Sequence, residues 1–515
     1  MKNKLLKSTT LVSGMTLISR IIGFVRDMVL ASIFGASGGY DAFLLAFKIP
    51  NFMRRLFAEG AFSQAFVPVL SEYRTSEETP RIKMLINKVF GSLSLVLLVV
   101  TFLGVIGAPL LVHLFAPGFD SEDDRFTLAA HLLQVTFPYI FFISLTAFAS
   151  GIQNAHGKFA IPALTPVLLN ICLIAAAVLF SSYFTEPVKA LGWGVLFAGV
   201  LQLLFQAPFL AKLSLFPRPM VDWRDPGVRR ILTLMVPALV GASVMQVNLL
   251  VDTMFASFLP VGSLTWLFYS DRLLEFPIGI FGVALATVIL PHLSHHYAKK
   301  SEEHFSASID WALRWILLIG VPAMIGLILL ATPILTTLFH YGKFNAFDVT
   351  MTARSLIALS IGLVCFLAVK VLVSAFYARQ NTKFPVKVAI AAMIINVIFN
   401  ALLIAPLAHA GLALASSLSS IFNVAVLLWV LLRQEIYRPL LGWKSFSLRL
   451  ILANSAMAAV LLWFTPVATQ WLEWGGVERM MGLSALIGAA MLAYGGGLWL
   501  SGLRVSHLRL ESVSS

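Results

Sequence analysis

The stretch FKIPNFMRRLFAEGAF, residues 47–62, sets two arginines, Arg54 and Arg55, side by side in an otherwise apolar sequence. Lys48 precedes the pair and Glu59 follows it. The whole chain is similarly apolar: 59% of its 515 residues are hydrophobic, 12% are charged, and the mean hydropathy is +0.89. Soluble domains carry roughly 25% charged residues. The sequence therefore predicts an all-α polytopic membrane protein, in which the few intramembrane charges are costly and are retained for a function.

Apolar runs of about 20 residues, the length that spans a bilayer, divide the chain into fourteen expected transmembrane helices. They cover residues 10–34, 41–71, 85–115, 126–152, 161–183, 190–211, 229–259, 264–294, 306–339, 350–378, 385–407, 410–432, 446–465 and 480–502. This order places twenty Lys and Arg residues in loops on one side and three (Lys189, Lys343 and Arg479) in loops on the other. Because cytoplasmic loops are enriched in basic residues, we expect both termini in the cytoplasm.

Short motifs recur along the chain in the same order. The pairs are ASIFGASGGYDAF from Ala31 with ASFLPVGSLTWLF from Ala256, FVPVLSEY ending at Tyr73 with ILPHLSHHY ending at Tyr297, and IQNAHGKF (152–159) with ARQNTKF (378–384). The offsets are 225, 224 and about 226 residues, which corresponds to six spans. Two six-helix copies with the same orientation predict a parallel pseudo-two-fold repeat, an arrangement found in transporters. We expect an N-lobe at 1–220, a C-lobe at 221–440 and two extra helices at 441–515.

Several other classes of protein are disfavoured. No loop is long enough for a separate catalytic domain, and no GxxxxGK phosphate loop is present, so we expect neither an enzyme nor an ATPase. Cys172 and Cys365 lie in apolar segments far apart and are expected in the core, not in a disulfide. The net charge of +13 is explained by basic loops, so we expect no nucleic-acid partner.

The charges in the expected spans gather on single helix faces, because many of them recur at spacings of three, four or seven residues. They are Arg20, Arg26, Asp27, Asp41, Lys48, Arg54, Arg55 and Glu59 in the first two spans, Asp271, Arg272 and Glu275 in the eighth, and Lys370 in the tenth. The first group has five basic and three acidic residues. Two interpretations stay open. The charges form ion pairs that hold the helices together, or they line a wet cavity whose excess arginines bind an anion such as phosphate.

A second polar set lies in the expected C-lobe. Asp252 is the acid of the seventh span, Asn396 and Asn400 are four residues apart in the eleventh, and Ser416 lies in the twelfth. Their oxygens suit a small hard cation such as Na⁺, although Asn and Ser also join helices by hydrogen bonds alone. The adjacent histidines of LSHHY, 293–297, do not share a helix face, so no metal site is predicted from them.

Four stretches closely resemble the MurJ/MviN family, the lipid II flippases of bacterial cell-wall synthesis. They are SRIIGFVRD (19–27), DAFLLAFKIPNFMRRLFAEGAFSQAFVPVL (41–70), SDRLLEFPIGIFGVALATVILP (270–291) and HYGKFNAFD (340–348). The resemblance extends over essentially the whole chain. It implies the fold of the multidrug/oligosaccharidyl-lipid/polysaccharide exporter superfamily, whose two lobes enclose a cavity that opens alternately to each side. It also implies that helices 13 and 14 form a hydrophobic groove for a lipid tail, and that the protein lies in the bacterial inner membrane.

The resemblance also implies roles for the charged residues. The residues that would hold the pyrophosphate of lipid II are Arg20, Arg26, Arg54, Arg55 and Arg272. Those expected to line or gate the cavity are Asp27, Asp41, Lys48, Glu59, Asp271, Glu275 and Lys370. A sodium site described for family members implies one at Asp252, Asn396, Asn400 and Ser416. We expect no cofactor beyond Na⁺ or another coupling ion. As partners we expect lipid II, membrane lipids and other cell-wall synthesis proteins, and a monomer suffices because one chain carries both lobes.

Three rival functions fit the sequence less well. A cation-coupled drug exporter of the same fold would need an acidic or aromatic cavity for cationic drugs, and the charges of the first two spans are mainly basic. A membrane enzyme acting on polyprenyl phosphates would need metal-binding acids, but the acidic run DSEDD, 120–124, reads as a solvated outer loop. A flippase for another polyprenyl-linked glycan would share the pyrophosphate, so only the family resemblance favours lipid II.

Overall fold

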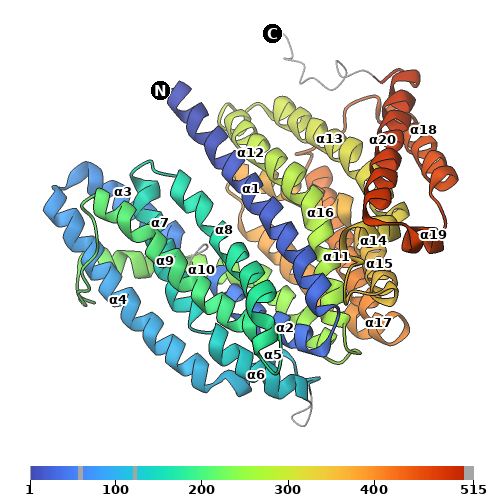
Figure 1. Cartoon of the computed structure of the whole chain (residues 1–515). Helices are drawn as coiled ribbons and strands as arrows, with labels where there is room; N and C mark the ends of the chain where they lie inside the picture. Colours follow the sequence, from blue (N-terminus) through green and yellow to red (C-terminus); the bar gives the residue numbers. More distant parts are fainter. Residues whose placement is uncertain (1, 56–61, 120–123, 504–515) are drawn as a thin grey trace. The chain divides into compact units, whose positions relative to one another are not determined.

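The computed structural model describes residues 2–55, 62–119 and 124–503 (Figure 1). Within these ranges the chain is helical and contains no strand, which confirms the all-α prediction. The α-helices are α1 (Lys2–Phe34), α2 (Gly38–Met53), α3 (Ser63–Ser76), α4 (Thr79–Ile106), α5 (Ala108–Phe115), α6 (Asp124–Thr136), α7 (Tyr139–Ala155), α8 (Ala160–Ala175), α9 (Lys189–Lys212), α10 (Pro226–Ser257), α11 (Ser263–Pro277), α12 (Val283–Ala298), α13 (Glu302–Leu329), α14 (Ala331–Phe339), α15 (Ala346–Ser360), α16 (Leu363–Ala378), α17 (Lys383–Arg433), α18 (Trp443–Phe464), α19 (Ala468–Glu473) and α20 (Gly476–Leu500). Two π-helical segments, η2 (Ala176–Phe180) and η4 (Ile278–Gly282), and the short η3 (Ser181–Tyr183) complete the set.

Ten helical stretches in the described ranges are long and apolar enough to cross a membrane. They keep large apolar side chains on the outside: on α4, Phe102, Leu103 and Ile106 are each more than 60% exposed. Extended apolar surfaces of this kind mark contact with lipid or with another protein. Every expected span overlaps helical sequence, while the number of fourteen crossings stays a prediction.

The helices repeat in the order that the sequence motifs predict. α4 and α13 both have 28 residues, and they begin at Thr79 and Glu302, 223 residues apart. Each is followed by a short helix, α5 or α14, after a break at Gly107 or Leu330. The pairs α6/α7 and α15/α16 come next in the two copies, and α8 and α17 follow them. The duplication is therefore visible in the helix boundaries and not only in the motifs.

The contacts divide the chain into two compact units, residues 1–265 and 266–515. In the first unit, α10 packs against α3, α4 and α5, and Arg230 of α10 forms an ion pair with Glu72 of α3 at 2.8 Å. This division follows packing, whereas the predicted lobe boundary after residue 220 follows the repeat and stays a prediction.

In the second unit, α17 is one helix with a kink. Ala408 has φ 49° and ψ −130° inside it, between the two spans expected at 385–407 and 410–432. α18 and α20 pack against each other, α13 contacts α18, and α14 contacts α20. Leu330, Met457, Leu461 and Trp471 form part of the apolar cluster beneath them. The two extra C-terminal helices are thus docked on α13 and α14.

Candidate functional site

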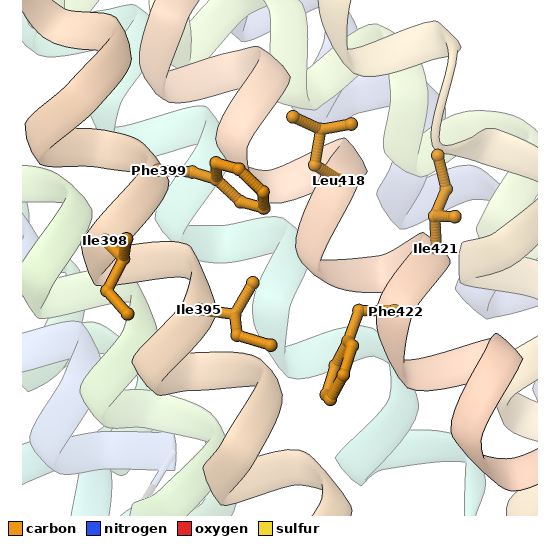
Figure 2. Close-up of a pocket in the computed structure, with 6 residues that line it drawn as sticks. All are labelled: Ile395, Ile398, Phe399, Leu418, Ile421 and Phe422. Carbon is orange, nitrogen blue, oxygen red and sulfur yellow. The ribbon is translucent and has the colours of Figure 1, made fainter.

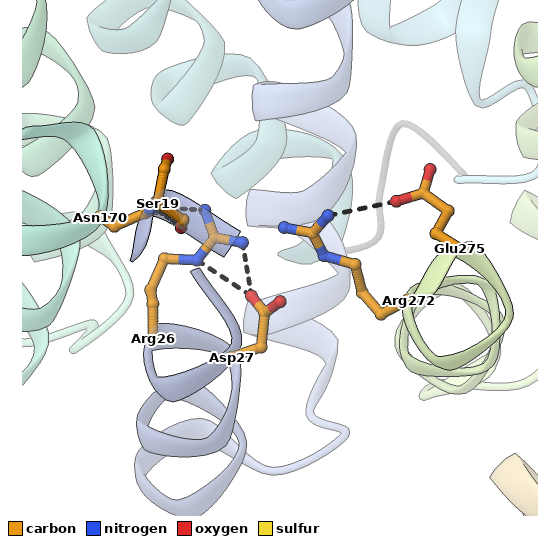
Figure 3. Close-up of polar contacts among 6 residues, drawn as sticks. All are labelled: Ser19, Arg26, Asp27, Asn170, Arg272 and Glu275. Atoms are coloured by element: carbon orange, nitrogen blue, oxygen red, sulfur yellow. Dashed lines mark hydrogen bonds and ion pairs between the residues drawn. The ribbon is translucent and has the colours of Figure 1, made fainter. Parts of the chain in front are cut away.

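Arg26 of α1 is held in place by two neighbours (Figure 3). Its Nε donates to Asp27 Oδ1 at 2.9 Å, and its Nη1 donates to Oδ1 of Asn170, on α8, at 2.9 Å. Asn170 in turn donates to the carbonyl of Ser19 at 3.3 Å. Arg26 is 7% exposed and Asp27 is 1% exposed. An anionic ligand of Arg26 would therefore share the guanidinium with Asp27, while Arg20, one and a half turns earlier, is exposed.

The end of α2 gathers three cationic side chains. Lys48, Arg54 and Arg55 are all half-buried. Nε and Nη2 of Arg54 donate to Asn51 Oδ1 at 3.0 and 2.8 Å. α2 ends at Met53, and residues 54–55 continue it with π-helical hydrogen bonding. Glu59, the acid predicted beside the arginines, lies outside the described residues.

A proline lies in α2 about one turn before the two arginines. Pro50 lies inside α2, so it has no N–H to donate to the carbonyl of Ala46. Oγ1 of Thr136, on α6 and fully buried, donates to that carbonyl at 3.1 Å. Freed backbone groups in membrane helices require a partner of this kind. The hydroxyl therefore satisfies the backbone of α2 two residues before Lys48.

Asp41 lies at the other end of α2 and is 1% exposed. Its Oδ2 accepts from the backbone N–H of Gly262 at 2.6 Å. Its Oδ1 accepts from the backbone N–H of Thr265 at 3.0 Å and from Thr265 Oγ1 at 2.6 Å. The first N–H groups of a helix have no intrahelical acceptor, so Asp41 caps the start of α11 from another helix. The predicted gating residue thus joins the starts of α2 and α11, which are equivalent helices of the two repeats.

The predicted charges of the eighth span are more open. Nη1 of Arg272 is 3.3 Å from Glu275 Oε2 (Figure 3), and Asp271 and Glu275 are exposed. An exposed pair at this distance contributes little stability. Lys370 of α16 is half-buried, and a Cβ on Gly282 would lie 3.3 Å from its Cδ. The glycine of η4 therefore gives the stem of Lys370 room.

Three of the four predicted cation ligands lie together on α17. Asn396 Nδ2 donates to Ser416 Oγ at 3.4 Å, and Asn400 Nδ2 donates to Asn396 Oδ1 at 3.0 Å. Both asparagines are fully buried. These hard, neutral oxygens fit a sodium ion in type, and they also form a hydrogen-bonded chain across the kinked helix. Asp252 lies in the other unit, on α10, and is half-buried.

One polar cluster was not predicted. Asp310 of α13 is 1% exposed, and its Oδ1 accepts from Tyr437 Oη at 2.8 Å, from the N–H of Leu440 at 3.1 Å and from Trp443 Nε1 at 2.6 Å. Its Oδ2 pairs with Arg314 Nε at 2.7 Å. The cluster ties the segment before α18 to α13. The four-residue spacing of Asp310 and Arg314 is a signal that the sequence offered.

The second unit also contains a wholly apolar pocket of about 310 Å³ between the two arms of α17 (Figure 2). Its lining residues are Ile395, Ile398, Phe399, Leu418, Ile421 and Phe422. Such a pocket offers nothing to a charged headgroup, so the polar candidates remain those of α1, α2, α11 and the asparagine chain of α17. Their roles as ligands or gates stay predictions.

Comparison with known sequences gives a consistent result. Residues 30–480 match the family described as Lipid II flippase MurJ. A protein named probable lipid II flippase MurJ from Vibrio cholerae serotype O1 is 44% identical over 513 residues, covering 98% of each chain. Its namesake from Haemophilus influenzae is 44% identical over 507 residues, covering 96% of this chain and 99% of the relative.

Comparison with solved structures agrees. The structure described as lipid II flippase MurJ in an inward closed conformation matches with a TM-score of 0.78 at 29% identity, and the match covers 95% of this chain and 99% of the other. Both family and fold therefore extend over nearly the full length, including the region of α2.

Proposed function

The chain belongs to the MurJ family of lipid II flippases, and we propose that it moves lipid II from the inner to the outer leaflet of the bacterial cytoplasmic membrane. Lipid II is an undecaprenyl pyrophosphate that carries a disaccharide-pentapeptide. The protein is a multi-pass membrane protein and acts as a transporter, so no covalent bond of the lipid changes. Its termini lie in the cytoplasm, and it works as a monomer beside other cell-wall synthesis proteins.

The basic end of α2 is the observation that carries this proposal. Lys48, Arg54 and Arg55 are half-buried within eight residues of one another, and an anionic ligand would offset the cost of burying their positive charges. Guanidinium groups bind phosphate oxygens in pairs, whereas an ammonium group acts as a single charge. We assign the two arginines to the pyrophosphate, with Arg20, Arg26 and Arg272 as further ligands.

The Asp41 contact supplies the gate. We place the start of α2 and the loop before α11 on the outer side of the membrane. Hydrogen bonds to a charged group contribute about 1.5–3 kcal/mol each, so three such bonds would hold the start of α11 against α2. Release of the lipid outside would break them. Asp271, Glu275 and Lys370 would line the path of the polar headgroup.

The membrane potential and a coupling ion would supply the energy for transport. A net negative headgroup moving outward gains roughly 2.3 kcal/mol per elementary charge per 100 mV, because the inside is negative. Asn396, Asn400 and Ser416, together with Asp252, would hold Na⁺ as the coupling ion. Sodium would supply a counter-charge there, and replacing external Na⁺ by choline should slow transport if this assignment is correct.

The test is depletion and rescue with a readout of lipid II on the outer leaflet. Cells that lose their own flippase receive this chain, its Arg54→Ala/Arg55→Ala form, or the Arg54→Lys/Arg55→Lys form. The intact chain should restore outer-leaflet lipid II. The alanine form should fail. The lysine form should rescue in part, because it keeps the positive charge but cannot donate paired hydrogen bonds to phosphate as a guanidinium does.

The matched control is Arg81→Ala, which removes an arginine that is 72% exposed and pairs with Glu77. It should rescue like the intact chain at equal membrane abundance. Full rescue by the alanine form would reduce the pair to a structural role. No rescue by the intact chain would instead point to another polyprenyl-linked glycan or to a drug as the substrate.

A further inference from the structure

Four histidines gather where α12 ends and α13 begins. The ring centres of His292 and His296 are 5.0 Å apart, and those of His296 and His304 are 5.4 Å apart. His295 lies 5.7 Å from His296. His292 and His296 are separated by one helical turn and share a face, whereas His304 comes from the next helix. The adjacent pair that carried no prediction thus becomes part of a set that spans two helices.

The two spacings from His296, to His292 and to His304, match those of imidazoles around one metal ion. Zinc binds histidine nitrogen at about 2.0–2.1 Å in a tetrahedral arrangement, which sets neighbouring ring centres roughly 5 Å apart. Aromatic stacking alone does not account for the set, because the His292 and His296 rings are nearly perpendicular at 78° while the His296 and His304 rings are nearly parallel at 12°. Among the described residues no group of three His, Cys, Asp or Glu side chains is arranged to hold a metal ion as the side chains stand. Metal binding would therefore turn the rings about their side-chain bonds.

The backbone between the ligands is fixed. The N–H of Ser301 donates to the carbonyl of His296 at 3.0 Å, and the N–H of Lys300 donates to the carbonyl of Tyr297 at 2.9 Å. Lys300 has φ 54°, so these bonds form the usual left-handed ending of a helix. The turn therefore holds the end of α12 and the first turn of α13 at a set distance, and only the imidazoles need to move.

One ring nitrogen of His304 already has a hydrogen-bond partner. Ser301 Oγ lies 2.6 Å from Nδ1 of His304, which leaves Nε2 of that ring for a metal. Histidine ligands are commonly oriented by a hydrogen bond of this type on the other ring nitrogen. His292 is exposed, and His296 and His304 are half-buried, so the site is reachable from water.

We propose that His292, His296 and His304 form a binding site for a divalent transition metal of the zinc class. The three imidazoles leave a fourth position for water. The bound ion would link α12 to α13 across the turn and restrain their relative movement. The site lies apart from the basic end of α2 and does not rest on the proposed lipid substrate.

The test is titration of the purified full chain with ZnCl₂ alone, followed by calorimetry. Saturable binding with one ion per chain is expected, and chelation by EDTA should reverse it. Removal of His296 by His296→Ala, or of the pair by His292→Ala/His304→Ala, should weaken binding at least about tenfold, since even outer partners of a metal ligand are worth 10- to 100-fold. Binding should also weaken on acidification, because protons compete with the metal for the imidazole nitrogens.

The control is His113→Ala, which removes an exposed histidine of α5 far from this cluster in sequence. It should bind zinc like the intact chain. Thermal unfolding without metal checks that each variant is folded, and added zinc should raise the midpoint only where the cluster is intact. Equal binding by the intact chain and the His296→Ala variant, or no saturable binding at all, would overturn the proposal.

Discussion

Asp310 is predicted to fix the C-terminal helix pair to α13, and the Asp310→Ala variant tests this. The carboxylate is almost fully buried and accepts three hydrogen bonds while it pairs with Arg314. Removing this buried carboxylate should cost up to about 3–5 kcal/mol, because the three donors lose their acceptor and Arg314, which is half-buried, loses its counter-ion. Asp310→Asn keeps an oxygen for the three donors and loses the charge, so it should cost about 1.5–3 kcal/mol.

The size of the effect follows from the contact with the segment before α18. The N–H of Leu440 donates to Asp310 Oδ1, so its hydrogen exchange reports whether the segment is docked. A loss of about 3 kcal/mol corresponds to exchange faster by about 100-fold if the segment opens locally. Arg314→Ala in the Asp310→Ala background should recover part of the loss, since it removes the uncompensated charge.

The assay is hydrogen exchange of the purified chain followed by mass spectrometry, together with thermal unfolding. Arg438→Ala is the matched control: it removes an ion pair with Glu435 in the same segment whose two side chains are 68% and 73% exposed, and such pairs contribute little. Exchange at Leu440 that is equal in Asp310→Ala and Arg438→Ala would refute the reasoning.

Three further predictions concern backbone geometry and titration. Ala408→Gly should raise the free energy of unfolding by about 1 kcal/mol, because positive φ strains alanine. The same change in a regular helix would lower the free energy of unfolding, so the sign of the shift in thermal midpoint shows whether Ala408 is strained. Thr136→Val should cost about 1–3 kcal/mol in denaturant unfolding, because the carbonyl of Ala46 loses its donor, while Thr136→Ser should cost much less. Burial, and then the charge of Arg479, lower the pKa of His340. The neutral histidine therefore contributes stability above its usual pKa of about 6.5, and this contribution is lost as the pH falls. The thermal midpoint of the His340→Asn variant should fall less on acidification than that of the intact chain.

Much of the fold could be predicted from the sequence, since apolar length and the motif offset act over whole helices. The expected spans overlap helices throughout, and the offset of about 224 residues recurs in the helix boundaries. The breaks at Gly107 and Leu330 were not predicted. A membrane helix tolerates glycine and proline where neighbours satisfy the backbone, so an apolar run of 30 residues does not reveal whether it is one helix or two.

The site was predicted less completely, for a different reason. Asp41 was identified from its charge, but its partners include the backbone N–H groups of Gly262 and Thr265, which no count of charged side chains includes. Asp310 and Arg314 were readable as an ion pair four residues apart, whereas the contact with Tyr437 joins residues 127 apart. Local spacing predicts ion pairs within a helix, whereas tertiary packing determines which of these pairs also bonds to distant segments.

The repeat indicates that the backbone conformation at Arg54 and Arg55 does not depend on their side chains. Residue 54, where π-helical hydrogen bonding begins after α2, is 224 residues before Ile278, where η4 begins after α11. π-helical turns often occur at functional sites, and this one is present in both copies, so the arginines are not needed to form it. The second copy has Ile278 and Gly279 where the first has Arg54 and Arg55. The repeat-matched variant Arg54→Ile/Arg55→Gly should therefore keep the thermal midpoint near that of the intact chain and lose outer-leaflet lipid II in the rescue assay. A variant that unfolds would make the arginines structural, and a stable variant that still rescues would remove them from the substrate site.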